Sequence, residues 1–174
     1  MKKIIYKFYL IGFVFALSSS CNAKKEYSIS SPSKNNELQF SLTKTGQPQY
    51  SLSSNGKSVL EPSLLGFEFE GIQKMTEGFE VINVDKNSVD TVWEQPWGEF
   101  KKVRDSHNEL IVHLKESKGE GRLVDIIFRV FDDGLGFRYS FPKQPHLDKV
   151  KISNEITQFS FPFDNDVWSI SVHR

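Results

Sequence analysis

The stretch RLVDIIFRVFDDGLGFRYSF, residues 122–141, decides the fold class of this chain. Apolar side chains recur at every second position on both sides of a turn: Val124, Ile126, Phe128 and Val130 before it, and Phe137, Tyr139 and Phe141 after it. The intervening DDGLG favours a β-turn over a metal site, because Asp caps its own backbone and Gly permits positive φ. A period of two is typical of half-buried strands. The stretch therefore predicts two strands joined by a turn, with Arg138 either on the solvent face or as a buried clamp.

The same period extends outward through the rest of the chain. Residues 55–56, Asn-Gly, predict a type I′ hairpin, whose two central positions need positive φ. After the amino-terminal stretch, no window of 11 or more residues keeps a helical period. Short strands at intervals of about 8–12 residues predict an all-β sandwich or barrel, with the 15 phenylalanines in an aromatic core. The other alternating segments are 37–43, 48–54, 65–70, 79–85 and 108–116.

The first residues have the organisation of an export signal. Three lysines precede an apolar run at 8–17, and small residues at 18–20 lead to Cys21. The run is shorter than the ~20 apolar residues of a membrane span. Cys21 is the only cysteine and follows LSSS, which resembles a bacterial lipoprotein box, so we expect a signal over 1–20 and lipidation at Cys21. The alternative is cleavage after Ala23, and either route predicts a periplasmic or outer-membrane-anchored protein.

Charge and motifs exclude several functions. Removing residues 1–20 leaves 19 basic and 22 acidic residues, a net charge near −3, with no basic stripe for nucleic acid. No phosphate loop, nucleophile elbow or Cys/His metal spacing occurs in the sequence. The sequence itself therefore predicts no catalytic motif and no metal site.

One segment, DTVWEQPWGEFKKVRDSHNEL at 90–110, follows neither the strand nor the helix period. Trp97-Gly98-Glu99 places a flat aromatic surface, a flexible joint and a carboxylate side by side. Such a set suits sugars, whose rings offer C–H faces and hydroxyl rims. The alternative buries both tryptophans of the segment in the core and leaves its charged residues in surface ion pairs.

Two segments resemble signature stretches of the amino-terminal domain of glycoside hydrolase family 97. They are QPWGEFKKVRDSHNELIVHL at 95–114 and IIFRVFDDGLGFRYSFP at 126–142. Their joint order and spacing are far more specific than a short motif, and the resemblance covers roughly residues 27–168. The matching elements are Trp97-Gly98-Glu99, Val103-Arg104, His107-Asn108-Glu109-Leu110 and the run from Phe128 to Tyr139.

The resemblance implies a β-super-sandwich of the galactose-mutarotase-like kind at the start of a larger exported α-glycosidase, α-glucosidase-like or an α-galactosidase. In the family a (β/α)₈ barrel follows, and it carries the catalytic carboxylates and most ligands of a catalytic calcium. Two acids flanking the bond are the usual requirement for glycoside hydrolysis. The chain ends at Arg174, so we expect residues 24–174 to be an incomplete domain, inactive without the barrel and without a cofactor of its own.

In this interpretation residues 95–109 form an irregular connection that faces the barrel and an α-linked oligosaccharide. Trp97 would stack on or wall the sugar, with Gly98 beside it as a flexible joint. Five residues would bond to sugar or across the domain interface: Glu99, Arg104, His107, Asn108 and Glu109. For Arg104 and Glu109 the interface is the favoured role. The alternatives are a stand-alone carbohydrate-binding lipoprotein and a purely structural one. An unpaired edge and an exposed apolar patch would favour the accessory domain; a closed sandwich with an aromatic groove would favour the binding module. Buried tryptophans would favour the structural protein.

Overall fold

The computed structural model describes residues 25–145, 147, 149–164 and 166. Within these residues the secondary structure is strand and turn, with no helix, so the all-β expectation is confirmed. The described part accordingly has no helix long and apolar enough to cross a membrane. The strands are β1 (Glu26–Ser30), β2 (Asn36–Leu42), β3 (Pro48–Ser54), β4 (Lys57–Leu64), β5 (Phe67–Phe69), β6 (Phe79–Glu94), β7 (Lys102–Glu116), β8 (Leu123–Val130), β9 (Leu135–Ser140) and β10 (Ile152–Glu155).

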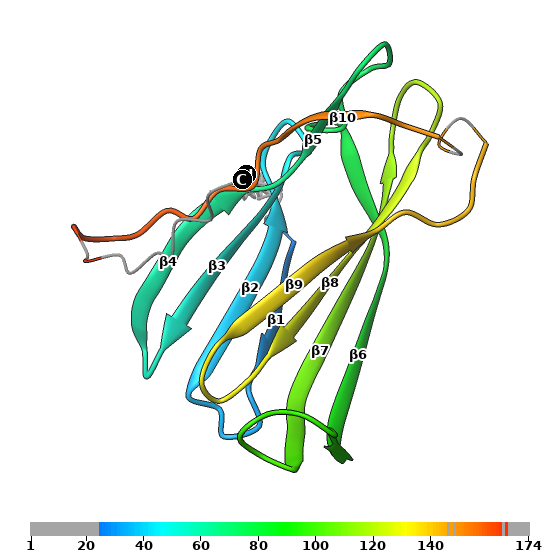
Figure 1. Ribbon diagram of the computed structural model, residues 1–174. Helices are drawn as coiled ribbons and strands as arrows, with labels where there is room; N and C mark the ends of the chain where they lie inside the picture. Colours follow the sequence, from blue (N-terminus) through cyan, green and yellow to red (C-terminus); the bar gives the residue numbers. More distant parts are fainter. Residues whose placement is uncertain (1–24, 146, 148, 165, 167–174) are drawn as a thin grey trace, which may run out of the picture.

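Two four-stranded antiparallel sheets form the sandwich (Figure 1). One has the order β1-β2-β3-β4 and the other β6-β7-β8-β9, while β10 and β5 form a separate two-stranded sheet. Every pairing is antiparallel, and within each four-stranded sheet consecutive strands are neighbours. This meander arrangement follows from short turns between strands, which can only join antiparallel neighbours.

The apolar side chains of the predicted alternation form the core. The inward positions of β8 are all buried, and Phe128 packs its ring 6.0 Å from Phe40 of β2 and 5.9 Å from Tyr50 of β3. These tilted aromatic contacts join the two sheets, as expected where inner faces interdigitate. Arg138 lies on the exposed face of β9, so the solvent-face alternative is the observed one.

Both turns singled out in the sequence are present. Asn55 and Gly56 have φ of 50° and 74°, as a type I′ hairpin requires. In the 132–136 turn the backbone N–H of Phe131 donates to the Gly134 carbonyl, while the Asp132 carboxylate accepts from the backbone N–H of Ser33 at 2.8 Å. The acid therefore ties the β8–β9 turn to the β1–β2 turn of the other sheet.

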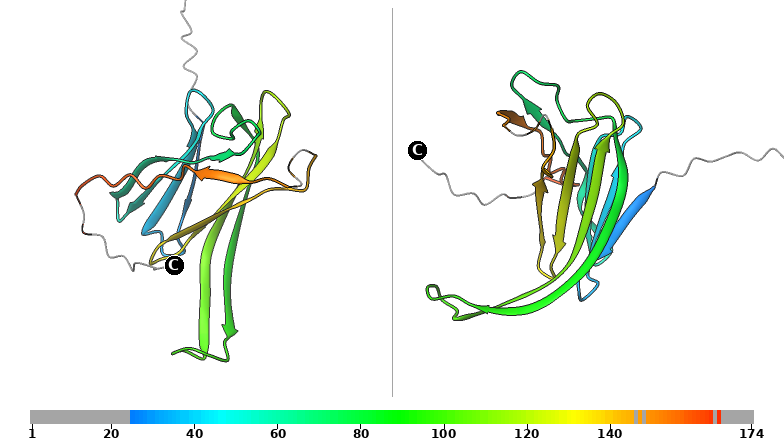
Figure 2. Two further views of the ribbon diagram at one scale, coloured as in Figure 1. Left: turned by 45° about the horizontal axis from the view of Figure 1, so that its top comes forward. Right: turned by 90° about the vertical axis from the view of Figure 1, so that its right-hand side faces the viewer.

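The hairpin of β6 and β7 reaches well beyond the other strands and curves (Figure 2). Its register pairs Glu94 with Lys102, which leaves 95–101 as the loop. The expectation that 95–109 is an irregular connection is therefore wrong: β7 begins at Lys102. β8 pairs with β7 only as far as Asn108, and beyond it both faces of the two-stranded ribbon are largely exposed. Because the less exposed positions of β7 there include the polar Asp105 and His107, apolar alternation is absent and the strand could not be predicted from the pattern.

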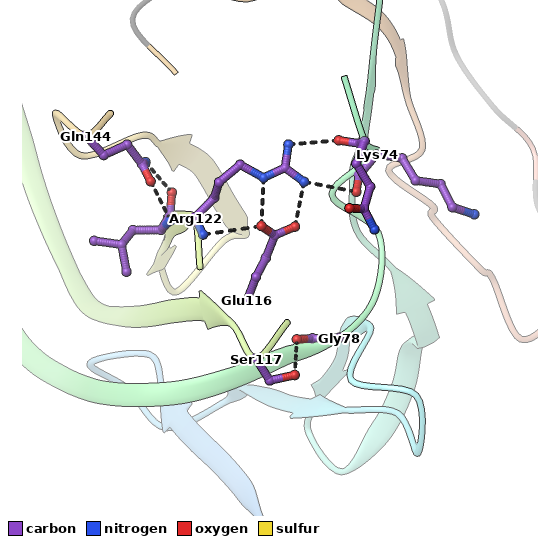
Figure 3. Close-up of polar contacts among 8 residues, drawn as sticks. Lys74, Gly78, Glu116, Ser117, Arg122 and Gln144 are labelled. Atoms are coloured by element: carbon purple, nitrogen blue, oxygen red, sulfur yellow. Dashed lines mark hydrogen bonds and ion pairs between the residues drawn. The ribbon is translucent and has the colours of Figure 1, made fainter. Parts of the chain in front are cut away.

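A buried ion pair fixes the root of this hairpin (Figure 3). Arg122 donates to both carboxylate oxygens of Glu116, from Nε at 2.7 Å and from Nη2 at 2.6 Å, and the two side chains are 3% and 7% exposed. Further guanidinium bonds reach the carbonyls of Gln73 and Lys74. Because Glu116 ends β7 and pairs with the first residue of β6, this network sets where the hairpin leaves the sandwich.

The segment 156–160 closes part of the side between β4 and β9. Its backbone bonds to the Gly66 and Leu64 carbonyls, and Phe159 packs 6.5 Å from Tyr50 and 6.2 Å from Phe137. Exposed apolar side chains occur before, in and after this segment, and within the part of the chain that the structure describes β9 and β10 each pair with one neighbouring strand. We call these exposed residues the strap patch: Val150, Ile152, Phe159, Phe161 and Phe163.

Candidate functional site

The outer part of the hairpin, residues 89–107, carries most of the predicted site, and we call it the arm. Along it β6 and β7 pair only with each other, over roughly 20 Å at ~3.3 Å per residue. Its tip is aromatic: Trp97 is 85% exposed and Phe100 68% exposed, and Trp93 is half exposed near the end of β6. The tryptophans are therefore not core residues.

The tip loop has a defined conformation. The backbone N–H of Gln95 donates to the Lys101 carbonyl at 3.0 Å, and its side-chain amide donates to the Phe100 carbonyl at 2.9 Å. Gly98 has φ of 120°, and a Cβ there would lie 2.7 Å from Gln95 Nε2. Glycine suits this backbone angle, and its lack of a side chain leaves room for the Gln95 amide. The loop holds Trp97 in an outward position, with Glu99 exposed beside it.

Arg104 lies on the arm with Asp90 as its partner. Its Nε and Nη2 each bond to one carboxylate oxygen of Asp90 at 2.7 Å, a bidentate geometry. These hydrogen bonds lower the pKa of Asp90 and raise the pKa of Arg104, and the nearby Asp132 carboxylate adds to the effect on Arg104. Both side chains are exposed, so the pair adds little stability but keeps a charged surface along the arm.

His107 is buried at the base of the arm. Its Nδ1 lies 2.6 Å from the Asp105 carboxylate, and its ring packs 5.0 Å from that of Phe131. Its Nε2 is buried and has no hydrogen-bond partner among the described residues. A carboxylate on Nδ1 favours the tautomer with the proton there, which leaves Nε2 as an acceptor. His107 is therefore packed inside the domain instead of facing a ligand.

Asn108 and Glu109 contact other strands. The Asn108 amide donates to the Ser30 carbonyl of β1 at 2.8 Å, so it joins the two sheets. Glu109 accepts from Arg129 of β8 at 2.9 Å and its side chain is mostly buried. Like the Arg104 pair, these contacts are made within the domain.

The structure therefore spreads the seven predicted residues along the arm. Trp97, Gly98 and Glu99 lie together at the tip, and Arg104 lies part of the way along. His107, Asn108 and Glu109 lie where the arm joins the sandwich, about 20 Å from the tip along β7. Sequence reasoning missed Phe100, an exposed aromatic whose spacing of three from Trp97 across a Gly could have indicated a shared tip surface. Among the described residues no group of three or more His, Cys, Asp or Glu side chains is arranged to hold a metal ion, and Cys21 lies outside them.

Comparisons with known proteins agree with the signature stretches. The family described as glycosyl-hydrolase 97 N-terminal matches residues 29–174. Among curated proteins, the chain is similar to a retaining α-galactosidase of Bacteroides thetaiotaomicron, with 24% identity over 146 residues, 83% of this chain and 20% of that protein. It is also similar to a probable retaining α-galactosidase of Streptomyces bingchenggensis, with 29% identity over 136 residues, 75% of this chain and 19% of that protein.

Solved structures give the same result. A glycoside hydrolase family 97 enzyme of a Pseudoalteromonas species, in complex with acarbose, is 36% identical with a TM-score of 0.74. A β-arabinopyranosidase is 32% identical with a TM-score of 0.71. The match covers 78% of this chain in both cases, and 20% and 21% of those chains, so the chain spans about a fifth of the length of these relatives. The chain therefore belongs to the glycosyl-hydrolase 97 N-terminal family.

Proposed function

We propose that this domain is a non-catalytic part of a glycoside hydrolase and presents its aromatic arm to the catalytic part and the bound carbohydrate. The observation that carries the proposal is Trp97, 85% exposed on a loop that Gln95 and Gly98 hold in one conformation. Burying a large apolar side chain is worth about 1.5–3 kcal/mol. An exposed aromatic tip on a ribbon anchored by a buried ion pair is suited to contact something outside the domain.

The second support is the open side of the sandwich. The strap patch exposes three phenylalanines, of which Phe159 packs on Phe137 of β9, and among the described residues β9 and β10 each have one unpaired edge. Both features favour an accessory domain over a free binding module, because a self-contained sandwich covers such surfaces. The relatives, about five times as long, have the additional chain that could cover them.

The carbohydrate follows from the relatives by analogy. Their names include α-galactosidase, β-arabinopyranosidase and an acarbose complex, all of which concern pyranosides. We propose a pyranoside ligand at the interface, where an aromatic face can stack on the sugar ring and Glu99 can accept from hydroxyls. In this proposal catalysis and any calcium belong to the catalytic part, and none of this domain's own acids takes part in bond cleavage.

The test is a chimera in which the chain replaces the matching fifth of the Pseudoalteromonas enzyme. We expect no hydrolysis of p-nitrophenyl α-glucoside or α-galactoside by the chain alone, activity in the chimera, and a higher KM in the chimera with Trp97→Ala. Ile82→Ala, at an exposed apolar residue outside both the arm and the strap patch, is the matched control for loss of exposed apolar surface and should leave the KM unchanged. Hydrolysis by the chain alone would overturn the proposal, whereas sugar binding by the chain alone, lost with Trp97→Ala, would favour the stand-alone binding module.

We also propose that the protein is exported and carries a lipid at Cys21. The support is the basic start, the apolar run and the small residues before that cysteine. Metabolic labelling with a fatty acid in a bacterial host should label the chain, and Cys21→Ser should abolish the label. An unlabelled but exported chain cut after Ala23 would replace lipidation with ordinary signal cleavage.

A further inference from the structure

A polar groove separate from the arm tip lies between β1 and the hairpin. It has a volume of about 430 Å³, within the range of about 300–1,000 Å³ typical of small-ligand sites. Its lining includes two lysines and several hydroxyl and amide groups, and no aspartate or glutamate. The polar residues that line it from both sides include Ser28, Ser30, Lys34, Lys86, Ser88 and Asn108.

The hairpin side of the groove is preorganised. Lys86 Nζ donates to the Ser28 carbonyl at 2.6 Å, and the Asn108 amide donates to the Ser30 carbonyl at 2.8 Å. These two bonds satisfy successive outward carbonyls of the edge strand β1. The Ser88 hydroxyl in turn donates to the side-chain oxygen of Asn108 at 2.7 Å, so the amide is fixed. An ammonium has three donors, so Lys86 keeps two beyond this bond.

The turn side presents Lys34 in an unusual conformation. The described residues contain two non-glycine residues with positive φ, Asn55 and Lys34, and Lys34 has φ of 64°. Its backbone N–H donates to the Ser31 carbonyl, and in such a turn the left-handed position favours glycine or asparagine. A lysine there costs backbone energy, and hydrogen bonds such as that from the Ser31 N–H to the Asn36 carbonyl at 2.8 Å hold the turn in this conformation. Strain of this kind is a reason to look for a function of the side chain.

We propose that this groove binds an anionic saccharide, with uronate or sulfate groups between Lys34 and Lys86 and sugar hydroxyls on the serine and asparagine side chains. No aromatic side chain lines the groove, so it offers no face for stacking a neutral sugar, in contrast to the arm tip. The anionic character rests on the two lysines alone. The saccharide class rests on the proposed function, so the two parts need separate tests.

The experiment is calorimetric titration of the purified chain with three matched ligands: trigalacturonate, maltotriose and tripolyphosphate. We expect trigalacturonate to bind, with an affinity that falls with added salt, and maltotriose not to bind in this groove. Lys34→Gly should lower the affinity for trigalacturonate about tenfold, as for one charge-assisted hydrogen bond. Because glycine suits the positive φ, the same variant should keep or raise the melting temperature, which separates binding from folding.

The other outcomes are equally decisive. Lys57→Met, which changes an exposed lysine at the β3–β4 turn, is the control and should leave the affinity unchanged. Absence of trigalacturonate binding, or binding that Lys34→Gly and Lys86→Met leave intact, overturns the site. Equal binding of tripolyphosphate would overturn the saccharide part and leave only general anion attraction. None of these results depends on the chimera assay, so failure here and failure of the proposed function are distinguishable.

Discussion

Arg122 and Glu116 form a bidentate ion pair inside the domain, six residues apart and on opposite sides of the β7–β8 turn. The pair joins the β7–β8 turn to the loop before β6, because the same guanidinium also bonds to the carbonyls of Gln73 and Lys74 in that loop. Ser117 adds a backbone and a side-chain bond to the Gly78 carbonyl (Figure 3). The place where the hairpin leaves the sandwich is therefore fixed by this network.

Replacing Arg122 with methionine should destabilise the domain by about 3–5 kcal/mol, because the Glu116 carboxylate would stay buried without a partner. The double variant Arg122→Met/Glu116→Leu should recover a large part of that loss, since no buried charge remains. Denaturant unfolding followed by tryptophan fluorescence measures both. Arg104→Met, which removes an exposed partner of Asp90, is the control and should change stability little. A single variant as stable as the control would contradict the role given to the pair.

The sequence contains a signal for this pair. Glu116 continues the inward set of Leu110, Val112 and Leu114, and Arg122 precedes the inward Val124 at the same spacing. The signal is a pair of opposite charges, one on each side of a turn, that both occupy inward positions of the strand alternation. A search for apolar alternation alone assigns both residues to a polar turn, because it follows the strand only as far as its side chains are apolar.

The arm shows what the sequence pattern could not predict. The strands β2, β3, β7 and β8 followed from apolar alternation because each has one buried face, whereas β1 and β4 are mostly exposed or half-buried and were not predicted from it. In residues 102–107 the less exposed positions, Val103, Asp105 and His107, are mostly polar, so the strand could not be predicted from apolar alternation. Likewise, the fixed position of Asn108 comes from β1, 78 residues earlier in the chain, and no local pattern contains that contact.

His113 gives the domain a titratable cross-strand contact. It lies between two carboxylates, with Nδ1 2.7 Å from Asp125 and Nε2 3.0 Å from Asp85. Burial by itself would lower the pKa of His113, but the hydrogen bonds to Asp85 and Asp125 outweigh it, so the pKa is raised. A raised folded-state pKa means that this stabilisation is complete below the unfolded value of about 6.5 and is lost as pH rises through the folded value.

The free energy of unfolding should therefore contain a component that falls as the pH rises above about 6.5, and His113→Gln should remove it. The difference between the two unfolding curves is the measurement, because titration of the other three histidines is common to both proteins. A difference that stays constant over this range would show that the histidine does not gain its proton on folding.

Two tyrosines should ionise at a higher pH than a free tyrosine. Burial raises the pKa of Tyr50 and of Tyr139 to about 12, and the Tyr50 hydroxyl donates to the Gln158 carbonyl at 2.9 Å. Because the folded-state pKa is above the unfolded value of about 10, their contribution to stability is lost as pH rises from about 10 to 12. In a pH titration of the folded chain, tyrosinate absorbance should rise in a separate step at high pH, and Tyr50→Phe should make that step smaller. Complete ionisation of all five tyrosines near pH 10 would contradict the burial of these rings.

Gly46 lies in the turn between β2 and β3, and Gly56 lies in the turn between β3 and β4. Comparing them tests how the β2–β3 turn supports the root of the hairpin, because the two glycines share a backbone angle and differ in surroundings. Their φ values are 78° and 74°, so alanine costs each about 1–2 kcal/mol for the left-handed conformation. A Cβ on Gly56 meets nothing within 4 Å, whereas one on Gly46 would lie 2.8 Å from the backbone N and O of Phe79, the first residue of β6.

Gly46→Ala must therefore also displace backbone, at a further cost of about 1–3 kcal/mol, and it strains the bond from the Phe79 N–H to the Gly46 carbonyl. Denaturant midpoints of the two alanine variants give the difference directly. Hydrogen exchange at Phe79 should quicken in the Gly46 variant and not in the Gly56 variant. Equal destabilisation with unchanged exchange would mean that this turn is not part of the support at the hairpin root.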